Sequence, residues 1–290
     1  MMLDRGPGLV EAAAYIQQFR DRLVVVKLGG ELLEDSPVLE RLLPQVAVMV
    51  QVGLRPILVH GGGKQIDRAC TERGIVPVKH RGRRVTDDGT LGVLLEVVGG
   101  DLNRAVVSRL RKLEIEAFGF EEGAGDAIVC TRRAPTVEEG VTVDWGHVGD
   151  VVRIDARRLM PEPGTPWRVP VLPSLGMLVD GGRVNVNADA VASKVASDLG
   201  AVKLVLMTAV DGVMEHMSDA GPISELTAAE ARGLIDDQVV VGGMRAKLEE
   251  ALRAIANGVP RVHILTGRDP MTLLREIFTD EGCGTLIVPQ

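Results

Sequence analysis

Short runs of β-branched and aliphatic residues alternate along this chain with stretches of helical spacing, and this alternation most constrains the fold. Each run is long enough for one buried strand, and most of them end in glycine or threonine. The runs lie at residues 22–30, 55–63, 169–176, 202–208, 261–267 and 285–290. Because strands and helices alternate, we predict an α/β protein with a mainly parallel sheet covered by helices on both faces.

The segments between the runs carry helix signals. Two apolar stripes have helical spacing, Val191, Val195 and Leu199 in one and Met244, Leu248, Ala251 and Ile255 in the other. The second stripe stops at Asn257 and Gly258, a typical helix end, and Thr227 followed by Glu230 has capping-box spacing. Residues 120–155 contain only short β-branched runs, so we expect an antiparallel hairpin insertion there.

Composition excludes several function classes. The 290-residue chain carries a net charge of −7, which argues against nucleic acid or an anionic membrane as its main partner. It has no apolar run of membrane length and no signal-peptide pattern at its N-terminus, so we expect a cytoplasmic protein. Cys70, Cys130 and Cys283 are widely spaced without a CxxC pair, and we expect them to be reduced and structural.

Three glycine-rich stretches are expected beside the carboxyl ends of the strands. Gly29-Gly30 and Gly61–Gly63 each follow a predicted strand, and Gly242-Gly243 precedes the helix that carries Lys247. Glycine lets a backbone approach a ligand, and helix N-termini bind anions. One glycine pair alone is more typical of a tight turn. All three together, two of them with a lysine nearby, predict a phosphate site, although neither common nucleotide fingerprint is present.

Two lysines and one aspartate are the candidate catalytic groups. Lys27 ends an otherwise apolar strand, where an unpaired charge is costly, and Lys247 lies early in its helix. Phosphoryl transfer needs such cations around the transferring oxygens. Asn185, Asn187 and Asp189 alternate at strand spacing, so we expect them to face one side, with Asp189 between the lysines. The alternatives are a structural salt bridge for Lys27, a solvated surface position for Lys247 and, for the Asn and Asp residues, a cap on the following helix that Asp189 could also supply.

Six motifs occur together in the order and spacing of one family. They are VVVKLGG (24–30), LVHGGGKQI (58–66), RRVTD (83–87), NVNAD (185–189), GGMRAK (242–247) and EIFTDEGCGTLI (276–287). Over residues 22–290 the chain thereby resembles the N-acetylglutamate kinases of the amino-acid kinase family. The resemblance implies a three-layer αβα sandwich that uses ATP and Mg²⁺ to phosphorylate the side-chain carboxylate of N-acetyl-L-glutamate in arginine biosynthesis.

The resemblance also implies a domain organisation and a role for each matching residue. Residues 22–199 would bind the acyl-amino acid and residues 200–290 would bind ATP. Lys27 and Lys247 match catalytic lysines, and Asp189 matches the aspartate that organises them. Substrate binding is implied for Gly61, Gly62, Gly63, Arg84 and Asn185, and ATP binding for Gly29, Gly30, Thr208 and Gly243. No residue matches a metal ligand, and no general base is needed, because a side-chain carboxylate is already ionised at neutral pH.

Three departures from the family pattern concern the substrate. Lys64 stands where the family has a small residue or proline, and Ala209 replaces an aspartate after Thr208, with Asp211 nearby. The segment 120–128 lacks a lysine that the family usually carries there. These departures leave other acceptors open, such as an N-acetyl-aminoadipate-type or carrier-linked substrate.

The N-terminal segment 1–21 resembles the helix of arginine-inhibited, hexameric family members. Tyr15, Glu281 and Gly282 match their arginine site, whereas Met271 replaces the usual histidine. We expect a homodimer or hexamer with arginine as a candidate effector; a helix that only covers a sheet edge is the alternative. A non-catalytic arginine-sensing relative is the second function class, which retention of both lysines disfavours. Other amino-acid kinases fit RVTD and FTDEGCGT less well.

Overall fold

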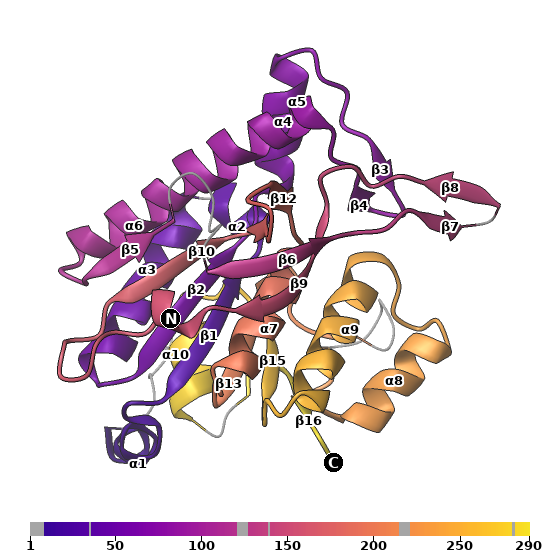
Figure 1. Cartoon of the computed structure of the whole chain (residues 1–290). Helices are drawn as coiled ribbons and strands as arrows, with labels where there is room; N and C mark the ends of the chain where they lie inside the picture. The colour runs from indigo at the N-terminus through magenta and orange to yellow at the C-terminus, as the bar shows by residue number, and fades with distance from the viewer. Residues whose placement is uncertain (1–8, 35, 121–126, 139, 215–220, 280–281) are drawn as a thin grey trace.

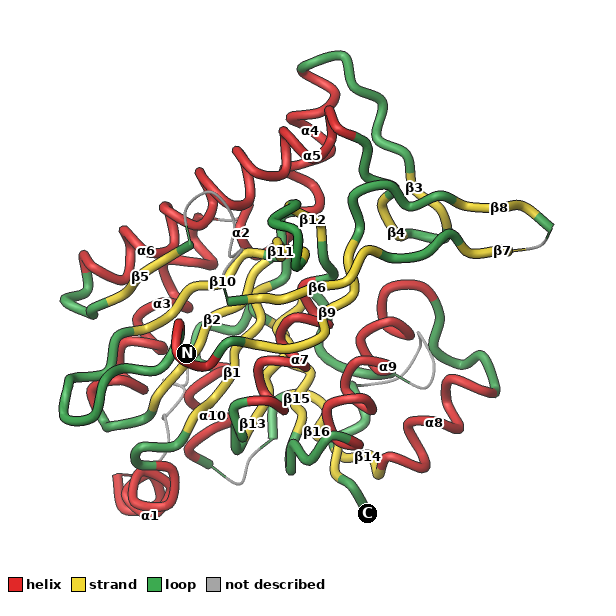
Figure 2. Tube along the Cα trace, in the orientation of Figure 1, coloured by secondary structure: helices red, strands yellow, loops and turns green. Residues whose placement is uncertain are grey.

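A single eight-stranded sheet runs through the computed structural model, which describes residues 9–34, 36–120, 127–138, 140–214, 221–279 and 282–290 (Figures 1 and 2). The described strands of the whole chain, which belong to this sheet and to smaller ones, are β1 (Leu23–Leu28), β2 (Arg55–His60), β3 (Lys79–His80), β4 (Arg83–Arg84), β5 (Ala117–Gly119), β6 (Ile128–Arg132), β7 (Thr136–Glu138), β8 (Val141–Val143), β9 (Gly149–Ile154), β10 (Val169–Pro173), β11 (Leu175–Leu178), β12 (Arg183–Asn185), β13 (Lys203–Thr208), β14 (Glu225–Thr227), β15 (Val262–Thr266) and β16 (Gly284–Val288).

The helices cover both faces of this sheet. They are α1 (Leu9–Phe19), α2 (Gly30–Glu34), α3 (Ser36–Gln51), α4 (Gly63–Glu72), α5 (Asp88–Leu94), the π-helix η1 (Leu95–Leu102), α6 (Asn103–Lys112), the 3₁₀-helix η2 (Ala156–Arg158), α7 (Ala188–Asp198), α8 (Ala228–Asp236), α9 (Gly242–Ala256) and α10 (Thr272–Phe278). None of these described helices combines the length and apolar character that a membrane span needs.

The strand order in the main sheet is β14-β16-β15-β13-β1-β2-β10-β5, and only β15 and β16 pair antiparallel. This confirms the mainly parallel sheet. Strands from residues 22–199 and from residues 200–290 meet where β1 pairs with β13, so the sheet is continuous across the predicted domain boundary. A division of binding roles between the two parts stays a prediction.

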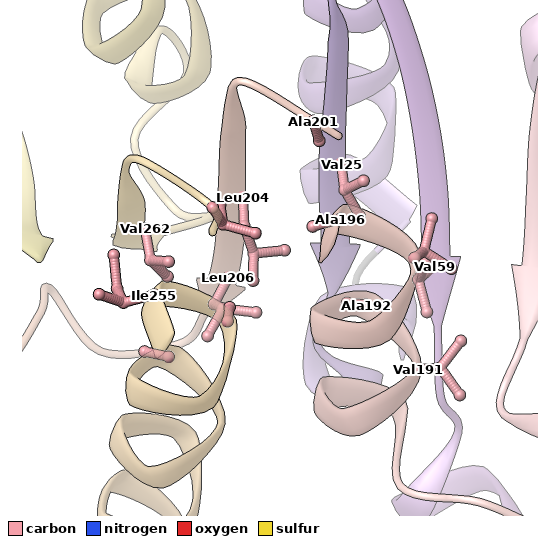
Figure 3. Packing of buried hydrophobic residues seen from close by; sticks show 14 of the residues in the cluster. Val25, Val59, Val191, Ala192, Ala196, Ala201, Leu204, Leu206, Ile255 and Val262 are labelled. Carbon is pink, nitrogen blue, oxygen red and sulfur yellow. The ribbon is translucent and has the colours of Figure 1, made fainter. Parts of the chain in front are cut away.

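Two apolar layers form because successive strand residues point to opposite faces. Val25, Val59 and Leu204 belong to the layer between the sheet and helices α7, α8 and α9, part of which is drawn in Figure 3. Val26 and Val205 belong to the layer on the opposite face, under α3, α6 and α10. Small residues of α7 let this helix lie close to β1 (Figure 3). The three-layer αβα sandwich is therefore confirmed.

A second, four-stranded sheet has the order β12-β11-β6-β9. Its antiparallel pair β6–β9 and the projecting hairpin β7–β8 confirm the antiparallel insertion expected within 120–155 (Figure 1). The expectation of one strand over 169–176 is wrong, because the chain leaves the main sheet at Ser174 and enters the second sheet as β11. Both halves of this run are almost wholly buried, so its apolar pattern does not mark the change of sheet.

Local capping signals are confirmed. Thr227 and Glu230 form a complete capping box at the start of α8. Helix α9 ends at Ala256 with Asn257 as its C-cap, and Gly258 follows with φ +91°, a left-handed conformation that favours glycine. All three cysteines are free, and burial raises the pKa of the Cys130 and Cys283 thiols to about 12, in agreement with the expected structural role.

Candidate active site

The two candidate catalytic lysines meet on one aspartate. The Lys27 Nζ atom lies 2.7 Å from Asp189 Oδ1, and the Lys247 Nζ atom lies 3.2 Å from Asp189 Oδ2. Lys27 is close to the end of β1 and, being two residues after Val25, points to the face covered by α7. Asp189 lies in the first turn of α7, and α9, which carries Lys247, packs against α7. Three elements thus bring together residues that are far apart in the chain.

Burial makes this cluster electrostatically strong. Lys27 and Asp189 are each only 6% exposed. Burial alone would raise the pKa of Asp189, but the charges of Lys27 and Lys247 outweigh it and lower this pKa to about 2. Burial lowers the pKa of Lys27, against the opposing effect of Asp189. The carboxylate is therefore ionised at neutral pH, and each of its oxygens is engaged by a lysine.

Two glycine loops touch beside the lysines. A Cβ atom added to Gly30, at the start of α2, would lie 3.0 Å from the Gly63 backbone nitrogen. A Cβ atom added to Gly62 would lie 2.7 Å from Leu102 Cδ1, because the π-helix packs against this loop. Helix α4 begins at Gly63, so its first N–H groups have no acceptor within the helix. The loops therefore offer backbone donors close to two cationic side chains, the chemistry that binds phosphate.

One cavity of about 370 Å³ collects most of the predicted site residues. Its lining includes Lys27, Gly30, Gly61, Gly62, Gly63, Arg84, Asn185 and Asp189. Arg84 enters from β4 and donates through Nη2 to the Gly63 carbonyl, 3.0 Å away. Asn185 enters from the end of β12 and donates to Thr86 Oγ1, 3.0 Å away. Lys247 contacts Asp189 but is not among the described lining residues. The cavity thus joins Lys27 and Asp189 to an arginine and an amide, a polar set that suits a small anionic ligand.

Asn185, Asn187 and Asp189 all line this cavity, as expected for one side, but the strand spacing that the expectation used ends at Asn185. Strand β12 ends at Asn185, and the Asn187 side chain caps α7 by accepting from the N–H groups of Asp189 and Ala190. The helix begins between these residues, so their side chains no longer alternate. Asn187 supplies the Asn/Asp cap that was the alternative for this segment, and Asp189 binds both lysines.

Most of the residues predicted to bind ATP do not line this cavity. Among the described residues that line the cavity, Gly30 is present, while Gly29, Thr208 and Gly243 are not. Thr208 ends β13, where its carbonyl accepts from the N–H of Gly267. Gly242 and Gly243 follow helix α8 rather than a strand, so the expectation of three strand-end glycine stretches holds for two of them. The ATP roles of these residues stay predictions.

Lys64 and Ala209, which depart from the family pattern, and Asp211 near Ala209 are not among the described residues that line the cavity. Lys64 is exposed on the first turn of α4 and is not part of the described cavity lining. Ala209 and Asp211 follow β13 outside that lining as well. Of the segment 120–128, residues 121–126 lie outside the described part of the chain.

The described residues among those expected to bind arginine lie on helix α1 or after helix α10. Tyr15 stacks on Phe19 within α1, with ring centroids 6.1 Å apart, and α1 contacts α10. Gly282 is exposed after α10, Met271 immediately precedes that helix, and Glu281 lies outside the described residues. An arginine site between these elements stays a prediction.

Sequence reasoning missed a histidine behind the glycine loop. His60, fully buried at the end of β2, has Nδ1 3.1 Å from the Gly61 carbonyl oxygen and Nε2 3.0 Å from Asn103 Nδ2. Because the Asn103 amide can only donate through Nδ2, His60 accepts at Nε2 and donates from Nδ1 to Gly61. Burial lowers the pKa of His60 to about 4, so the ring is neutral. The position of His60 directly before Gly61 was the sequence signal that this histidine lies near the glycine loop.

Sequence reasoning also missed Asp67, which contacts Arg84. The Asp67 Oδ1 atom accepts from Arg84 Nη2 at 2.7 Å. Asp67 lies four residues after Gly63 on α4, a spacing that places both on one side of the helix. That spacing was a signal for a position near the loop, but the partner on β4 could not be read from it.

Comparisons with known proteins place this chain in a family. A family model described as "Amino acid kinase family" matches residues 22–266. The chain is 36% identical to the acetylglutamate kinase of Methanocaldococcus jannaschii, covering 99% of this chain and 97% of that protein. It is 38% identical to the acetylglutamate kinase of Symbiobacterium thermophilum, covering 99% and 98%.

A solved structure has the same fold. The crystal structure of N-acetylglutamate synthase from Neisseria gonorrhoeae, complexed with coenzyme A and L-arginine, matches with a TM-score of 0.81 and 28% identity. The match covers 98% of this chain and 66% of the synthase, so this chain spans about two thirds of that protein.

Proposed function

The chain belongs to the amino acid kinase family, and we infer from this that it is an acetylglutamate kinase, which phosphorylates the side-chain carboxylate of N-acetyl-L-glutamate with ATP. The acetylglutamate kinases that it matches are similar over almost their whole length, which argues against a different acceptor class. The reaction would serve arginine biosynthesis in the cytoplasm.

The convergence of Lys27 and Lys247 on Asp189 is the observation that carries this proposal. Transfer of a phosphoryl group to a carboxylate brings two anions together, and their repulsion must be screened. Lys27 and Lys247 place two positive charges beside the glycine loops, and Asp189 fixes both ammonium groups. A purely sensory relative would have no need for two lysines on one buried carboxylate.

The chemistry requires no general base. The acceptor carboxylate is ionised at neutral pH, so one of its oxygens attacks the γ-phosphorus directly. The bond from that phosphorus to the β,γ-bridging oxygen breaks, and ADP leaves with the electron pair. No proton is transferred, in agreement with a site in which Asp189 is held by two lysines and the nearby His60 is neutral and turned to Gly61 and Asn103.

The remaining site residues suit binding and orientation. We assign Arg84 to the substrate α-carboxylate, because a guanidinium matches a carboxylate in charge and geometry, and Asn185 to the acylated amino end. Gly61, Gly62 and Gly63 would receive the transferring phosphate. Residues 200–290, with Gly29, Gly30, Thr208 and Gly243, would hold ATP in this proposal.

Mg²⁺ fits this site only together with ATP. Among the described residues there is no group of three or more His, Cys, Asp or Glu side chains placed to hold a metal ion. Asp189 is engaged by its lysines. We therefore assign Mg²⁺ to the ATP phosphates and to water, where it would neutralise phosphate charge.

Arginine regulation and oligomerisation are further parts of the proposal. Support comes from α1, which carries Tyr15 and packs against α10, and from the Neisseria gonorrhoeae synthase, which was crystallised with L-arginine. Calorimetric titration with arginine, on the wild type and on Tyr15→Ala, tests the site. Absence of heat with the wild type would remove arginine as an effector, and sedimentation would give the number of subunits.

The function itself is tested by trapping the acyl phosphate as hydroxamate. The purified protein is incubated with Mg-ATP and N-acetylglutamate, and in parallel with N-acetyl-aminoadipate or glutamate. We expect N-acetylglutamate to be the preferred acceptor and Lys247→Ala to abolish product. Preference for N-acetyl-aminoadipate would reassign the acceptor, and no product with any acceptor would favour a non-catalytic relative.

A further inference from the structure

Arg84 is held at one edge of its guanidinium group. Its Nη2 atom donates to Asp67 Oδ1 at 2.7 Å and to the Gly63 carbonyl at 3.0 Å. An Nη atom carries two hydrogens, so both donors of Nη2 are used. The guanidinium is thereby hydrogen-bonded to helix α4 at two points, the carbonyl of its first residue Gly63 and the side chain of Asp67 one turn later.

The other edge of the same guanidinium has a donor without a partner. Arg84 Nη1 is buried and makes no hydrogen bond to any described residue. The whole side chain is only 8% exposed. A buried charged donor without an acceptor is costly, and such groups in native proteins call for a partner that is absent from the structure. Because Arg84 lines the cavity, a ligand carboxylate is the natural acceptor for Nη1.

Asp67 is itself fixed from a second side. Its Oδ2 atom lies 2.6 Å from Lys79 Nζ on β3, and β3 pairs with β4, which carries Arg84. The three side chains form a chain of charges in which one carboxylate neutralises one of two cations. One net positive charge therefore remains, enough to bind one substrate carboxylate.

We propose that Asp67 is a positioning residue, which fixes Nη2 of Arg84 so that Nη1 meets the α-carboxylate of the acyl-amino acid. The inference deepens the proposed function and depends on it. Asp67 does not touch the substrate in this arrangement. It determines the direction of the arginine, and through it the affinity for the acceptor but not for ATP.

The same contact allows an opposite function for Asp67. As a competitor for Arg84 it would have to be displaced by the substrate, and its removal would then strengthen acceptor binding. The orphaned Nη1 atom favours positioning, because a free edge remains while Asp67 is still bound.

Steady-state kinetics with N-acetylglutamate and Mg-ATP separate these functions. We expect Asp67→Ala to raise the KM for N-acetylglutamate about tenfold, the loss of one well-placed charged contact, with the KM for ATP and kcat within about twofold. Asp67→Asn keeps an acceptor oxygen and should recover part of the affinity. In an Arg84→Ala background, Asp67→Ala should add nothing.

Glu34→Gln is the matched control. Glu34 pairs with Arg68, which lies on α4 next to Asp67, and the side chains of Glu34 and Asp67 are exposed to a similar degree. It should leave both KM values unchanged. A lower acceptor KM in Asp67→Ala would establish competition, and an unchanged acceptor KM would overturn the inference while the proposed function stands. A parallel rise in the KM for ATP would show a general structural role. A wild type that phosphorylates no acylated amino acid would overturn both proposals.

Discussion

Lys27 and Asp189 form a buried ion pair, 2.7 Å apart, between strand β1 and the first turn of helix α7. Both charges are removed from water, and Asp189 also holds Lys247 at 3.2 Å. A buried charge is tolerated only with its partner present, because its desolvation is otherwise uncompensated. Removing either partner alone should therefore destabilise this region and displace the remaining charged groups.

Replacing Asp189 by asparagine should impair stability and catalysis together. Asparagine has almost the same shape but leaves the buried charge of Lys27 unbalanced, at a cost of about 3–5 kcal/mol. We expect kcat to fall by about 10²-fold or more, because both ammonium groups lose their orientation. Urea unfolding and the hydroxamate assay measure the two effects. A variant with wild-type kcat would exclude Asp189 as the organising group.

The two lysines near helix starts should differ sharply in effect. Lys247→Ala removes one of the two ammonium groups that contact Asp189 and should lower kcat by about 10²–10³-fold. Lys64→Ala, at an exposed position in the first turn of α4, should change kcat and both KM values by less than about threefold. Similar losses in both variants would place Lys64 in the reaction, contrary to the structure.

Adjacent glycines of the β2–α4 loop should respond differently to alanine. A Cβ on Gly62 would strike Leu102 and Val98, so Gly62→Ala should cost about 1–3 kcal/mol of stability. A Cβ on Gly63 meets nothing within 4 Å, so Gly63→Ala should fold normally. If the loop receives the transferring phosphate, Gly63→Ala should still lower kcat by about 10²-fold. Full activity of a well-folded Gly63→Ala would move the phosphate elsewhere.

His60 should make the protein less stable in acid. Its folded pKa of about 4 lies below the unfolded value near 6.5, so the unfolded chain binds the extra proton between these limits. Stability is therefore highest above pH 6.5 and is lost as the pH falls towards 4. Between pH 7.5 and 5.0 the wild type should lose about 2 kcal/mol more than His60→Gln in urea unfolding. Equal losses would show that His60 is not the group responsible.

Gln45 supplies a helix cap from a distant part of the chain. Its Oε1 atom accepts from the N–H groups of Leu273 and Leu274, and its Nε2 atom donates to the Pro270 carbonyl. Gln45→Leu should cost about 2–3 kcal/mol, because these buried backbone groups lose their partner. The exposed Gln51→Leu on the same helix is the control and should change stability by less than about 0.5 kcal/mol. Equal unfolding midpoints would contradict the cap.

The local signals that the sequence carries were sufficient for many of the elements. The capping box at Thr227, the C-cap of α9 at Asn257 and the stripe on α9 depend on neighbours within a few residues, and all three are confirmed. The division of 169–176 into β10 and β11 depends on which sheet each half joins. Burial on all sides hides that choice, because both sheets demand the same apolar residues.

The sequence by itself determined the fold class and the types of residue that form the site. Period-two and period-3.6 patterns act over one element, and motif order identifies the family, so both can be read along the chain. Only the tertiary structure decided that Asn187 rather than Asp189 caps α7, and that Asp67 holds Arg84. The Asp67–Arg84 contact joins side chains on α4 and β4, and Asp189 is engaged by lysines on β1 and α9, which leaves the local cap to Asn187. The geometry of these contacts depends on how α4, α7 and α9 pack on the sheet, and no spacing along the chain specifies that packing.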